Sequence, residues 1–362
     1  MKVAIVLGTR PEIIKMAPII WELEKLGEDF FILHSGQHYD YKMDRVFFEQ
    51  LKLPEPKYNL RVGSGTHAEE TGKTLIGVEK VLMKESPDVV LVEGDTNTVL
   101  AGALAAVKLH INVGHVEAGL RSHDKEMPEE INRIIVDHIS DYLFAPTEEA
   151  RENLLKEGID DEKVYVTGNT IVDAVHQCIK LAEGSNIVDA LGLKQNSFFL
   201  LTLHRQENVD IKDRLENIFR GLNLVVEELG LPMIYPCHPR TRKRIERFGI
   251  KLHDEIILTE PLDYLSFLKL EKEATMIFTD SGGVQEEACI LKVPCVTIRS
   301  STERPETVKV GANIVAGRSP EGILKAAKMM MSRTRSWPNP FGDGKAGKRI
   351  VYILRRELSL RG

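Results

Sequence analysis

Short apolar runs recur along the whole chain, and helical patterns of apolar and polar residues separate them. The first half contains such runs at residues 2–7, 30–34, 88–92, 111–116, 141–145 and 163–167. The second half repeats the scheme at residues 197–203, 233–237, 255–259, 275–279, 294–298 and 312–316. Runs rich in Val and Ile that alternate with helices are typical of parallel strands covered on both faces. The pattern therefore predicts an α/β protein with two doubly wound, Rossmann-like domains.

The boundary between the two domains is expected near residue 170. The last apolar run of the first half ends just before Gly168, and a helical pattern begins near Val172. We predict an N-terminal domain over residues 1–170 and a C-terminal domain over residues 171–344. The remaining segment, 345–362, follows the Pro- and Gly-rich stretch WPNPFGDG. We expect it to form a helix that packs back toward the N-terminal domain.

Length and charge narrow the classes of function. A chain of 362 residues with 43% apolar content is too long for one ordinary domain and can bury two cores. The formal net charge of -6 provides no overall basic field that would attract a nucleic-acid backbone, so no nucleic-acid partner is expected. The basic run between Arg240 and Arg247 is interpreted as a solvated helix face.

Cysteine usage and hydropathy indicate an intracellular protein. The four cysteines form no CxxC pair and are interpreted as reduced, structural residues. The first apolar run, which Arg10 closes, is too short for the core of a signal peptide. No other run approaches the roughly 20 residues needed to cross a bilayer. We expect a soluble, cytoplasmic protein with no membrane partner.

Polar residues follow directly after the first apolar run. In open parallel sheets, ligands bind at the carboxyl ends of the strands, so such positions carry the most information about function. Pro11 suits the first turn of a helix, and Arg10 and Lys15 would then lie near its start. Two cations beside outward-pointing amide groups form an anion site, although such residues at a helix start can also be merely solvated.

Two familiar nucleotide-binding patterns are not supported. No GxGxxG follows the first strand, so a dinucleotide-binding half is not expected. The TGKT sequence at residues 71–74 resembles the end of a P-loop, but the position that requires the first glycine is His67.

Acidic residues follow two successive predicted strands of the first half. Asp95 comes just after the run at 88–92, and Glu117 comes just after the run at 111–116. Close carboxylates repel and shift their pKa values apart, which suits one general acid and one general base. A further pair, Glu129 and Glu130, is equally consistent with ordinary acidity at a helix start. Clustered carboxylates could instead bind Mg²⁺, but no additional pattern supports a metal site.

The second half contains the most specific local signal, FTDSGGVQEEAC. A strand is followed by Asp280 and Ser281, then by two glycines and a helix. Gly282 and Gly283 would let backbone amides approach a phosphate that the helix start also attracts. Glu287 would lie in that helix, where its carboxylate could accept hydrogen bonds from ribose hydroxyls.

Further cations of the second half also follow predicted strands. His204 and Arg205 end the first strand of that half, and His238 ends the second. Each of the three could be a structural cap, but together at strand ends they favour anion binding. Arg304, in the sequence STERPE, is a further candidate for a phosphate contact.

These motifs together closely resemble one known family. The strings GTRPEIIKMAP, EGDTNT, GHVEAGLRS, PEEINR, TGNT, HRQEN, DSGGVQEEA and TERPE occur in the order and with the spacing of the non-hydrolysing UDP-N-acetylglucosamine 2-epimerases. The resemblance runs from residue 2 to the NPFGDGKA string that ends at residue 346. It implies the glycosyltransferase-B architecture, in which two Rossmann-like domains face each other across a cleft.

The resemblance also implies roles for individual residues. The family's acid and base carboxylates correspond to Asp95, Glu117 and Glu129, and His204 joins them as a catalytic residue. Contacts with the UDP-sugar are implied for Arg10, Lys15, Asp95, Glu117, His204, Phe267, Ser281, Gly282, Gly283, Glu287 and Arg304. A second, allosteric site would include Gln37, Arg205 and His238. The chain departs from the bacterial pattern for that site at Tyr39 and Asp40.

The activity that the resemblance implies is reversible epimerisation at C2 of UDP-N-acetylglucosamine to UDP-N-acetylmannosamine. It would proceed by anti elimination of UDP, a 2-acetamidoglucal intermediate and re-addition of UDP. The implied ligands are UDP-N-acetylglucosamine and UDP, with no cofactor and no metal, in a homodimer. A hydrolysing epimerase, a retaining glycosyltransferase and a catalytically silent nucleotide-sugar sensor remain the alternatives.

Overall fold

The computed structural model describes residues 1–36 and 41–361 and divides into two compact units. The first unit comprises Met1–Ala174 together with Phe341–Gly362, and the second comprises Val175–Pro340. The division falls inside α7 (Thr170–Ala182), the helix that we predicted to begin the second domain. Within the described residues, no helix combines the length and the apolar character that a bilayer span requires.

The first unit contains a sheet of parallel strands in the order β3-β2-β1-β4-β5-β6-β7. Its strands are β1 (Lys2–Leu7), β2 (Asp29–His34), β3 (Tyr58–Asn59), β4 (Val89–Glu93), β5 (Asn112–Val116), β6 (Tyr142–Ala145) and β7 (Val164–Val166). Each apolar run of the first half coincides with one of these strands. The short β3 was not predicted, because its two residues carry no apolar run and pair only with the end of β2.

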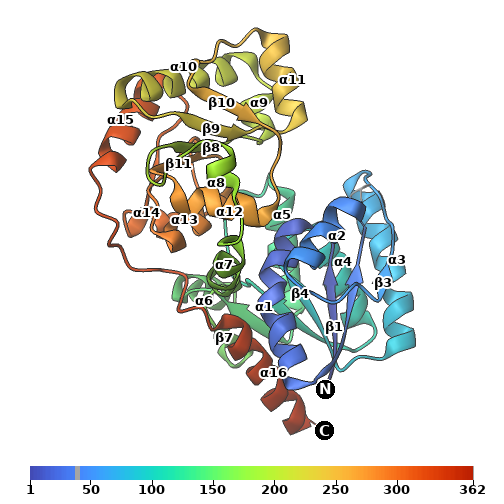
Figure 1. Ribbon diagram of the computed structural model, residues 1–362. Helices are drawn as coiled ribbons and strands as arrows, with labels where there is room; N and C mark the ends of the chain where they lie inside the picture. Colours follow the sequence, from blue (N-terminus) through green and yellow to red (C-terminus); the bar gives the residue numbers. More distant parts are fainter. Residues whose placement is uncertain (37–40, 362) are drawn as a thin grey trace. The chain divides into compact units, whose positions relative to one another are not determined.

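Helices cover both faces of this sheet. They are α1 (Arg10–Leu26), α2 (Tyr41–Gln50), α3 (His67–Glu85), α4 (Asn97–Lys108), α5 (Pro128–Ile139), α6 (Glu148–Lys156) and α16 (Ala346–Arg361). One core cluster joins Ala4 and Val6 of β1 with residues of α3, α4 and α5. The last helix, α16, packs against α1 although the two lie at opposite ends of the chain (Figure 1). The approach is close, because a β carbon on Gly347 would stand 2.8 Å from the backbone of Pro18.

The second unit contains a sheet of parallel strands in the order β10-β9-β8-β11-β12-β13. Its strands are β8 (Phe199–Thr202), β9 (Met233–Pro236), β10 (Ile256–Thr259), β11 (Met276–Thr279), β12 (Cys295–Thr297) and β13 (Asn313–Val315). Each apolar run of the second half coincides with a strand. The two sheets with their interleaved helices confirm the predicted α/β class.

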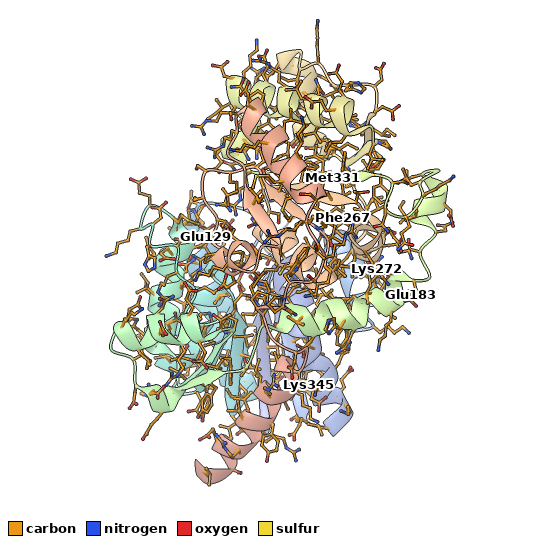
Figure 2. The ribbon with its side chains drawn as sticks, turned by 90° about the vertical axis from the view of Figure 1, so that its left-hand side faces the viewer. Glu129, Glu183, Phe267, Lys272, Met331 and Lys345 are labelled. Atoms are coloured by element: carbon orange, nitrogen blue, oxygen red, sulfur yellow. The ribbon has the colours of Figure 1, made fainter. Side chains whose placement is uncertain are left out.

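The helices of the second unit are α8 (Ile187–Ala190), α9 (Gln206–Val209), α10 (Lys212–Leu229), α11 (Pro239–Phe248), α12 (Tyr264–Glu273), α13 (Gly282–Leu291), α14 (Pro305–Lys309) and α15 (Pro320–Met331). Figure 2 shows Lys272 of α12 beside Glu183, which follows α7, and their Nζ and Oε1 atoms are 3.8 Å apart. This ion pair links α12 to the start of the second unit.

Both sheets reverse their strand order beside their first strand. In the first unit the reversal lies between β1 and β4, and in the second it lies between β8 and β11. In doubly wound sheets, ligands bind at the carboxyl ends of the strands that flank such a reversal. A functional site is therefore expected among the residues that follow these four strands.

Candidate functional site

The residues after β1 form a turn that a buried carboxyl group holds in place. Glu12 Oε2 accepts hydrogen bonds from the backbone N–H groups of Gly8 at 2.5 Å and Thr9 at 3.3 Å. Thr96, which follows β4, donates its hydroxyl to Glu12 Oε1 at 2.7 Å. Burial raises the pKa of Glu12 to about 7, although these hydrogen bonds oppose the rise. Glu12 therefore ties together the two strand ends that flank the reversal.

We did not assign a role to Glu12 from the sequence. The signal that could have found it is the spacing of Thr9 and Glu12, which matches a capping box at a helix start. That signal predicts a local cap only. The contact with Thr96 depends on the position of β4 beside β1.

Lys15 lies in α1 and is buried among carboxyl groups. Its Nζ forms an ion pair with Glu117 Oε2 and lies 3.5 Å from Glu93 Oε1. Arg10, in contrast, is exposed, and its guanidinium lies 5.0 Å from the centre of the Phe47 ring. Arg10 is thus at the surface, whereas Lys15 faces inward to carboxylates, and their joint role as an anion site stays a prediction.

Glu117 has an unusual backbone conformation. Its φ is 69°, in the left-handed region that residues with a side chain rarely adopt. Such strain persists only when surrounding contacts hold it, and it concentrates at functional sites. The Glu117 side chain is 5% exposed and is held by Lys15, so its orientation is tightly constrained.

Asp95 follows β4 and is bound to α5. Arg133 donates to Asp95 Oδ2 through one terminal nitrogen and to Glu130 Oε2 at 2.8 Å through the other. Asn132 donates its side-chain amide to the backbone carbonyl of Asp95 at 2.8 Å. The Asp95 side chain remains 30% exposed. Two successive residues of α5 therefore fix Asp95 while leaving part of its carboxylate accessible.

The two acidic residues at the start of α5 differ in environment. Glu130 is buried and accepts hydrogen bonds from the backbone N–H groups of Ser122 and His123, both at 2.9 Å. Burial raises the pKa of Glu130, but these hydrogen bonds and Arg133 outweigh it and lower the pKa below its usual value. Glu130 is thus a structural residue that closes its own loop. Glu129 lies in the first turn of α5 and is partly exposed (Figure 2).

A buried network that we did not predict supports the loops after β4 and β5. His115 Nδ1 lies 2.6 Å from Asp137 Oδ1, and His115 Nε2 lies 2.8 Å from the carbonyl oxygen of Gly94. Asp137 also accepts a hydrogen bond from Gly119 N at 3.2 Å and forms an ion pair with Arg121 at 2.7 Å. The network holds the backbone on either side of the candidate carboxylates, Gly94 before Asp95 and Gly119 after Glu117. Its signal, the His in GHVEAG, is indistinguishable in sequence from an ordinary core histidine.

In the second unit, Asp280 connects the ends of β8 and β11. It is fully buried and accepts hydrogen bonds from His204 N at 3.2 Å, Arg205 N at 3.1 Å and Asn208 Nδ2 at 3.1 Å. The His204 ring also contacts Asp280, with its Nδ1 3.2 Å from Asp280 Oδ1. The His204 side chain remains 57% exposed. Burial raises the pKa of Asp280, but these partners lower it below the usual value. Asp280 therefore holds the backbone and the ring of His204 in position.

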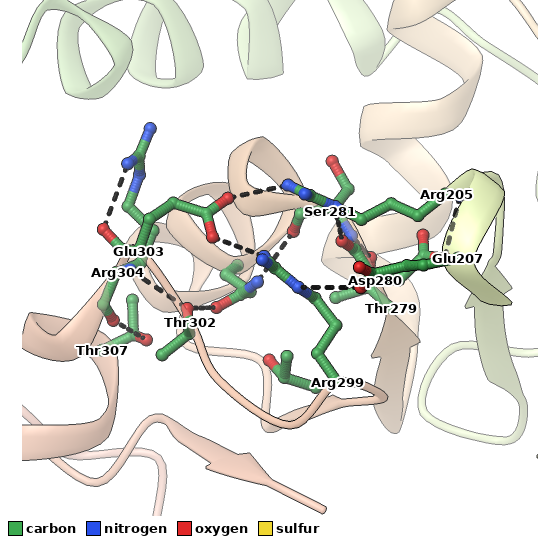
Figure 3. Close-up of polar contacts among 12 residues, drawn as sticks. Arg205, Glu207, Thr279, Asp280, Ser281, Arg299, Thr302, Glu303, Arg304 and Thr307 are labelled. Carbon is green, nitrogen blue, oxygen red and sulfur yellow. Dashed lines mark hydrogen bonds and ion pairs between the residues drawn. The ribbon is translucent and has the colours of Figure 1, made fainter. Parts of the chain in front are cut away.

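An arginine cluster surrounds the start of α13, as Figure 3 shows. Glu303 Oε1 accepts a hydrogen bond from Arg205 at 2.9 Å, and its other oxygen accepts one from Arg299. Burial alone would raise the pKa of Glu303. The positive charges of Arg304, Arg205 and Arg299 oppose burial and hold that pKa at about 2. Glu303 is therefore a carboxylate at neutral pH, enclosed by cations.

Glu303 and Arg299 were missed by sequence reasoning. Glu303 stands inside the TERPE motif that we had already singled out, whereas Arg299 lies between the apolar run that ends at residue 298 and that motif. Arg304, which we predicted to contact phosphate, has its Nε 2.7 Å from Glu286 Oε1, and its side chain is 10% exposed.

The remaining predicted contacts lie on α12 and α13. Ser281 is the N-cap of α13, and Gly282 and Gly283 form its first turn. Glu287 accepts a hydrogen bond from the buried Tyr264 hydroxyl at 3.0 Å. Phe267, on α12 (Figure 2), is 9% exposed and packs within a core cluster.

Two of the residues implied for a second ligand site, Arg205 and His238, have contacts within the second unit. Arg205 donates its Nε to the carbonyl oxygen of Asp280 at 2.8 Å and also binds Glu303. His238 is the N-cap of α11, where its Nδ1 accepts from Arg240 N at 3.2 Å. Its structural role is thus that of a cap. Gln37, Tyr39 and Asp40 lie outside the described residues. Among the side chains that the structure describes, no group of three or more His, Cys, Asp and Glu is arranged to hold a metal ion.

Comparison with known proteins agrees with the motifs. Residues 22–355 match the family model described as UDP-N-acetylglucosamine 2-epimerase. A UDP-N-acetylglucosamine 2-epimerase of Methanocaldococcus jannaschii is 59% identical over 361 residues, which cover 98% of this chain and 99% of that protein.

Solved structures give the same relationship. The crystal structure of Methanocaldococcus jannaschii UDP-GlcNAc 2-epimerase in complex with UDP-GlcNAc and UDP superposes with a TM-score of 0.90 at 58% identity, covering 98% of this chain and 100% of that one. The glycosyltransferase SnogD from Streptomyces nogalater shares the fold alone, with a TM-score of 0.52 at 13% identity over 98% of this chain and 99% of that one. The fold is thus of the glycosyltransferase-B class, and the chain belongs to the UDP-N-acetylglucosamine 2-epimerase family.

Proposed function

We propose that this protein converts UDP-N-acetylglucosamine to UDP-N-acetylmannosamine reversibly and without hydrolysis. The observation that carries the proposal is the pair of carboxylates at the ends of adjacent strands, Asp95 after β4 and Glu117 after β5, each held by its own cation. The relative with 58% identity was crystallised with UDP-GlcNAc and UDP, which supports the choice of ligand.

The chemistry explains why both carboxylates and a diphosphate site are needed. The proton on C2 of N-acetylglucosamine is not next to a carbonyl group, so a carboxylate alone cannot remove it. When the C1–O bond to UDP breaks, positive charge develops on the ring and acidifies C2. The C2–H electron pair then forms the C1–C2 double bond of 2-acetamidoglucal, and the proton passes to a carboxylate. Reprotonation on the opposite face and re-addition of UDP invert C2.

The second unit supplies groups suited to the departing diphosphate. The backbone N–H groups at the start of α13 and the arginines around them favour an anion there. At this position the pKa of Glu303 is lowered by the positive charges of Arg304, Arg205 and Arg299. Preorganised donors of this kind stabilise charge that develops on a leaving group. Elimination followed by re-addition leaves the overall oxidation state unchanged, so the reaction requires no redox cofactor.

Glu129 is the third carboxylate that we propose for the reaction. Arg133 and Asn132, one turn later in α5, both contact Asp95, so the start of α5 belongs to the same strand edge. The partial exposure of Glu129 is compatible with contact to a substrate. We also propose a homodimer, which light scattering after size-exclusion chromatography tests directly.

The deciding experiment follows C2 of UDP-N-acetylglucosamine by NMR during incubation with purified protein in D₂O. Deuterium at C2 of a product that still carries UDP is the expected result. Release of free N-acetylmannosamine with UDP would show a hydrolysing epimerase instead. Transfer of the sugar to an added acceptor would indicate a glycosyltransferase, and binding without turnover would indicate a sensor.

A further inference from the structure

Two buried carboxyl groups lie beside one ammonium group in the interior of the first unit, and a third buried carboxyl group is on the same helix as the ammonium group. Glu12, Glu93 and Glu117 are 2%, 2% and 8% exposed, and Lys15 is 8% exposed. Lys15 pairs with Glu117 and lies 3.5 Å from Glu93, while Glu12 is one turn earlier on the same helix. Lys15 thus divides its one positive charge between the Glu93 and Glu117 carboxyl groups.

The sheet brings Glu93 and Glu117 together. Glu93 is the last residue of β4, and its register partner on β5 is Val116, the residue before Glu117. The left-handed φ of Glu117 then turns its side chain to the Lys15 ammonium beside Glu93. The pairing of β4 with β5 thus fixes two carboxyl groups at one cation.

The free-energy cost of buried charge favours a protonated carboxyl group in this cluster. Each uncompensated charge in a protein interior costs several kcal/mol, and a carboxyl group avoids the cost by keeping its proton. Burial raises the pKa of Glu93 well above its usual value. The positive charge of Lys15 opposes the rise, whereas the negative charge of Glu117 increases it. Glu12 carries its own set of donors and has a pKa of about 7.

We infer that Glu93 is a positioning residue that holds one proton against Glu117, so that Glu117 enters the reaction as a carboxylate with a fixed orientation. In this arrangement Glu93 donates a hydrogen bond to Glu117, and Lys15 donates a second. The role of Glu117 as an acid–base group of the reaction rests on the proposed function. The shared proton itself is a property of the ligand-free protein and can be tested separately.

The surroundings of Glu93 contain few other ionisable groups. Lys15 and Glu12 face it from α1, and Glu117 faces it from the loop after β5. On β5, the neighbouring His115 is engaged with Asp137 and with the carbonyl oxygen of Gly94. Glu12 also titrates in this cluster, near pH 7, so the contribution of Glu93 to a pH dependence is identified by the variant that removes its ionisation.

The pH profile of kcat provides the first test. Above the pH at which the proton leaves, Glu93 and Glu117 are both negatively charged and repel, so Glu117 loses its donor and the rate falls. The amide of Glu93→Gln still donates to Glu117 but cannot ionise. We expect kcat of this variant within about threefold of the wild-type value at neutral pH, with the alkaline fall abolished or moved to higher pH.

Two further variants separate positioning from folding. Glu93→Leu lacks the donor, and we expect kcat to fall at least about tenfold at every pH while KM changes less. Glu85→Gln is the matched control, since Glu85 is the last residue of α3 and pairs with Lys57 and with Lys2 at the start of β1. It should leave the pH profile unchanged. An alkaline fall of Glu93→Gln at the wild-type pH would overturn the inference.

The second test uses the ligand-free protein and needs no activity. Carbon-13 NMR of glutamate side-chain carboxyl groups should show, in the wild-type protein, one resonance that titrates near pH 7 for Glu12. A second should titrate well above the ordinary glutamate range. Glu93→Gln should lose the second resonance and retain the first, and no change in the spectrum would refute the shared proton. If the wild-type protein showed no turnover, only the proposed function would be refuted. The titration of the ligand-free protein would still test the inference about Glu93.

Discussion

The Glu303 carboxylate stands directly in front of Gly282, the first residue of α13. A β carbon on Gly282 would lie 2.6 Å from Glu303 Oε1. The start of α13 and the nearby arginines therefore face the negative charge of the protein's own Glu303 carboxylate. A diphosphate that binds the same groups must displace Glu303 or share the arginines with it.

Replacing Glu303 with Gln should tighten the binding of UDP. The substitution removes the negative charge that competes for Arg205 and Arg299 but keeps a side chain of the same shape. We expect the dissociation constant for UDP to fall about tenfold, or about 1.4 kcal/mol. Isothermal titration calorimetry measures it, and Glu260→Gln, which removes an exposed partner of Arg242, is the control. Weaker binding by Glu303→Gln would show that Glu303 orients the arginines instead of competing with the ligand.

The two glycines at the start of α13 should respond differently to alanine. At Gly282 the new methyl group meets Glu303, whereas at Gly283 the nearest atom is Ser281 Oγ at 4.0 Å. Gly283→Ala should therefore be neutral or stabilise the protein by up to about 1 kcal/mol, because alanine loses less backbone entropy in a helix than glycine. Gly282→Ala should be less stable than Gly283→Ala by about 1 kcal/mol in urea unfolding. Equal stabilities would contradict the contact with Glu303.

Loss of either strand-end carboxylate should abolish turnover and spare nucleotide binding. Asp95→Asn and Glu117→Gln change the proposed acid–base groups of the first unit but none of the arginines around α13. We expect the UDP dissociation constant to stay within about tenfold of the wild-type value, or about 1.4 kcal/mol. Turnover is measured by the deuterium assay and UDP binding by calorimetry, with melting curves to verify folding. Near-normal rates in either variant would remove that residue from the mechanism.

The stability of the protein should depend on pH through Glu12. Its pKa is about 7 in the folded protein and 4.5 in the reference state, so the folded state binds the proton more tightly. This contribution to stability is complete below the unfolded pKa and is lost as the pH rises through the folded pKa. The difference amounts to about 3 kcal/mol.

The variant Glu12→Gln isolates this effect. Glutamine retains the capping-box geometry but cannot ionise. Relative to the variant, the wild-type protein should lose unfolding free energy between about pH 5 and about pH 8 in urea denaturation, by the amount estimated from the pKa shift. Parallel pH profiles of the two proteins would argue against an ionising Glu12.

Removing the charge of Asp280 should destabilise the second unit. Asp280 is fully buried and accepts hydrogen bonds from two backbone N–H groups and from Asn208. Asp280→Asn replaces one acceptor with a donor inside this network, and we expect a loss of about 2–3 kcal/mol in unfolding free energy. Asp210→Asn, at a partly exposed ion pair with Arg240, should cost less than about 1 kcal/mol. Equal losses in the two variants would contradict a scaffolding role for Asp280.

The sequence by itself determined the strands and the edge of each sheet that carries the polar residues. Continuous apolar runs such as KVAIVL and VVLVE form buried parallel strands because burial on both faces requires apolar side chains at successive positions. Asp95, Glu117 and Ser281 follow such runs directly, so their places at strand ends were predictable. The exception, β3, is too short to carry a pattern.

Only the tertiary structure decided which charged groups are partners. Lys15 and Glu117 are 102 residues apart in the sequence, and Arg205 and Glu303 are 98 apart. Local periodicity determines the secondary structure of each segment, but an ion pair requires two segments to meet at a strand edge with a defined register. For that reason the sequence placed Lys15 with Arg10 as an anion site. The fold instead buried Lys15 between Glu93 and Glu117, where a carboxylate without a cation would be too costly to keep.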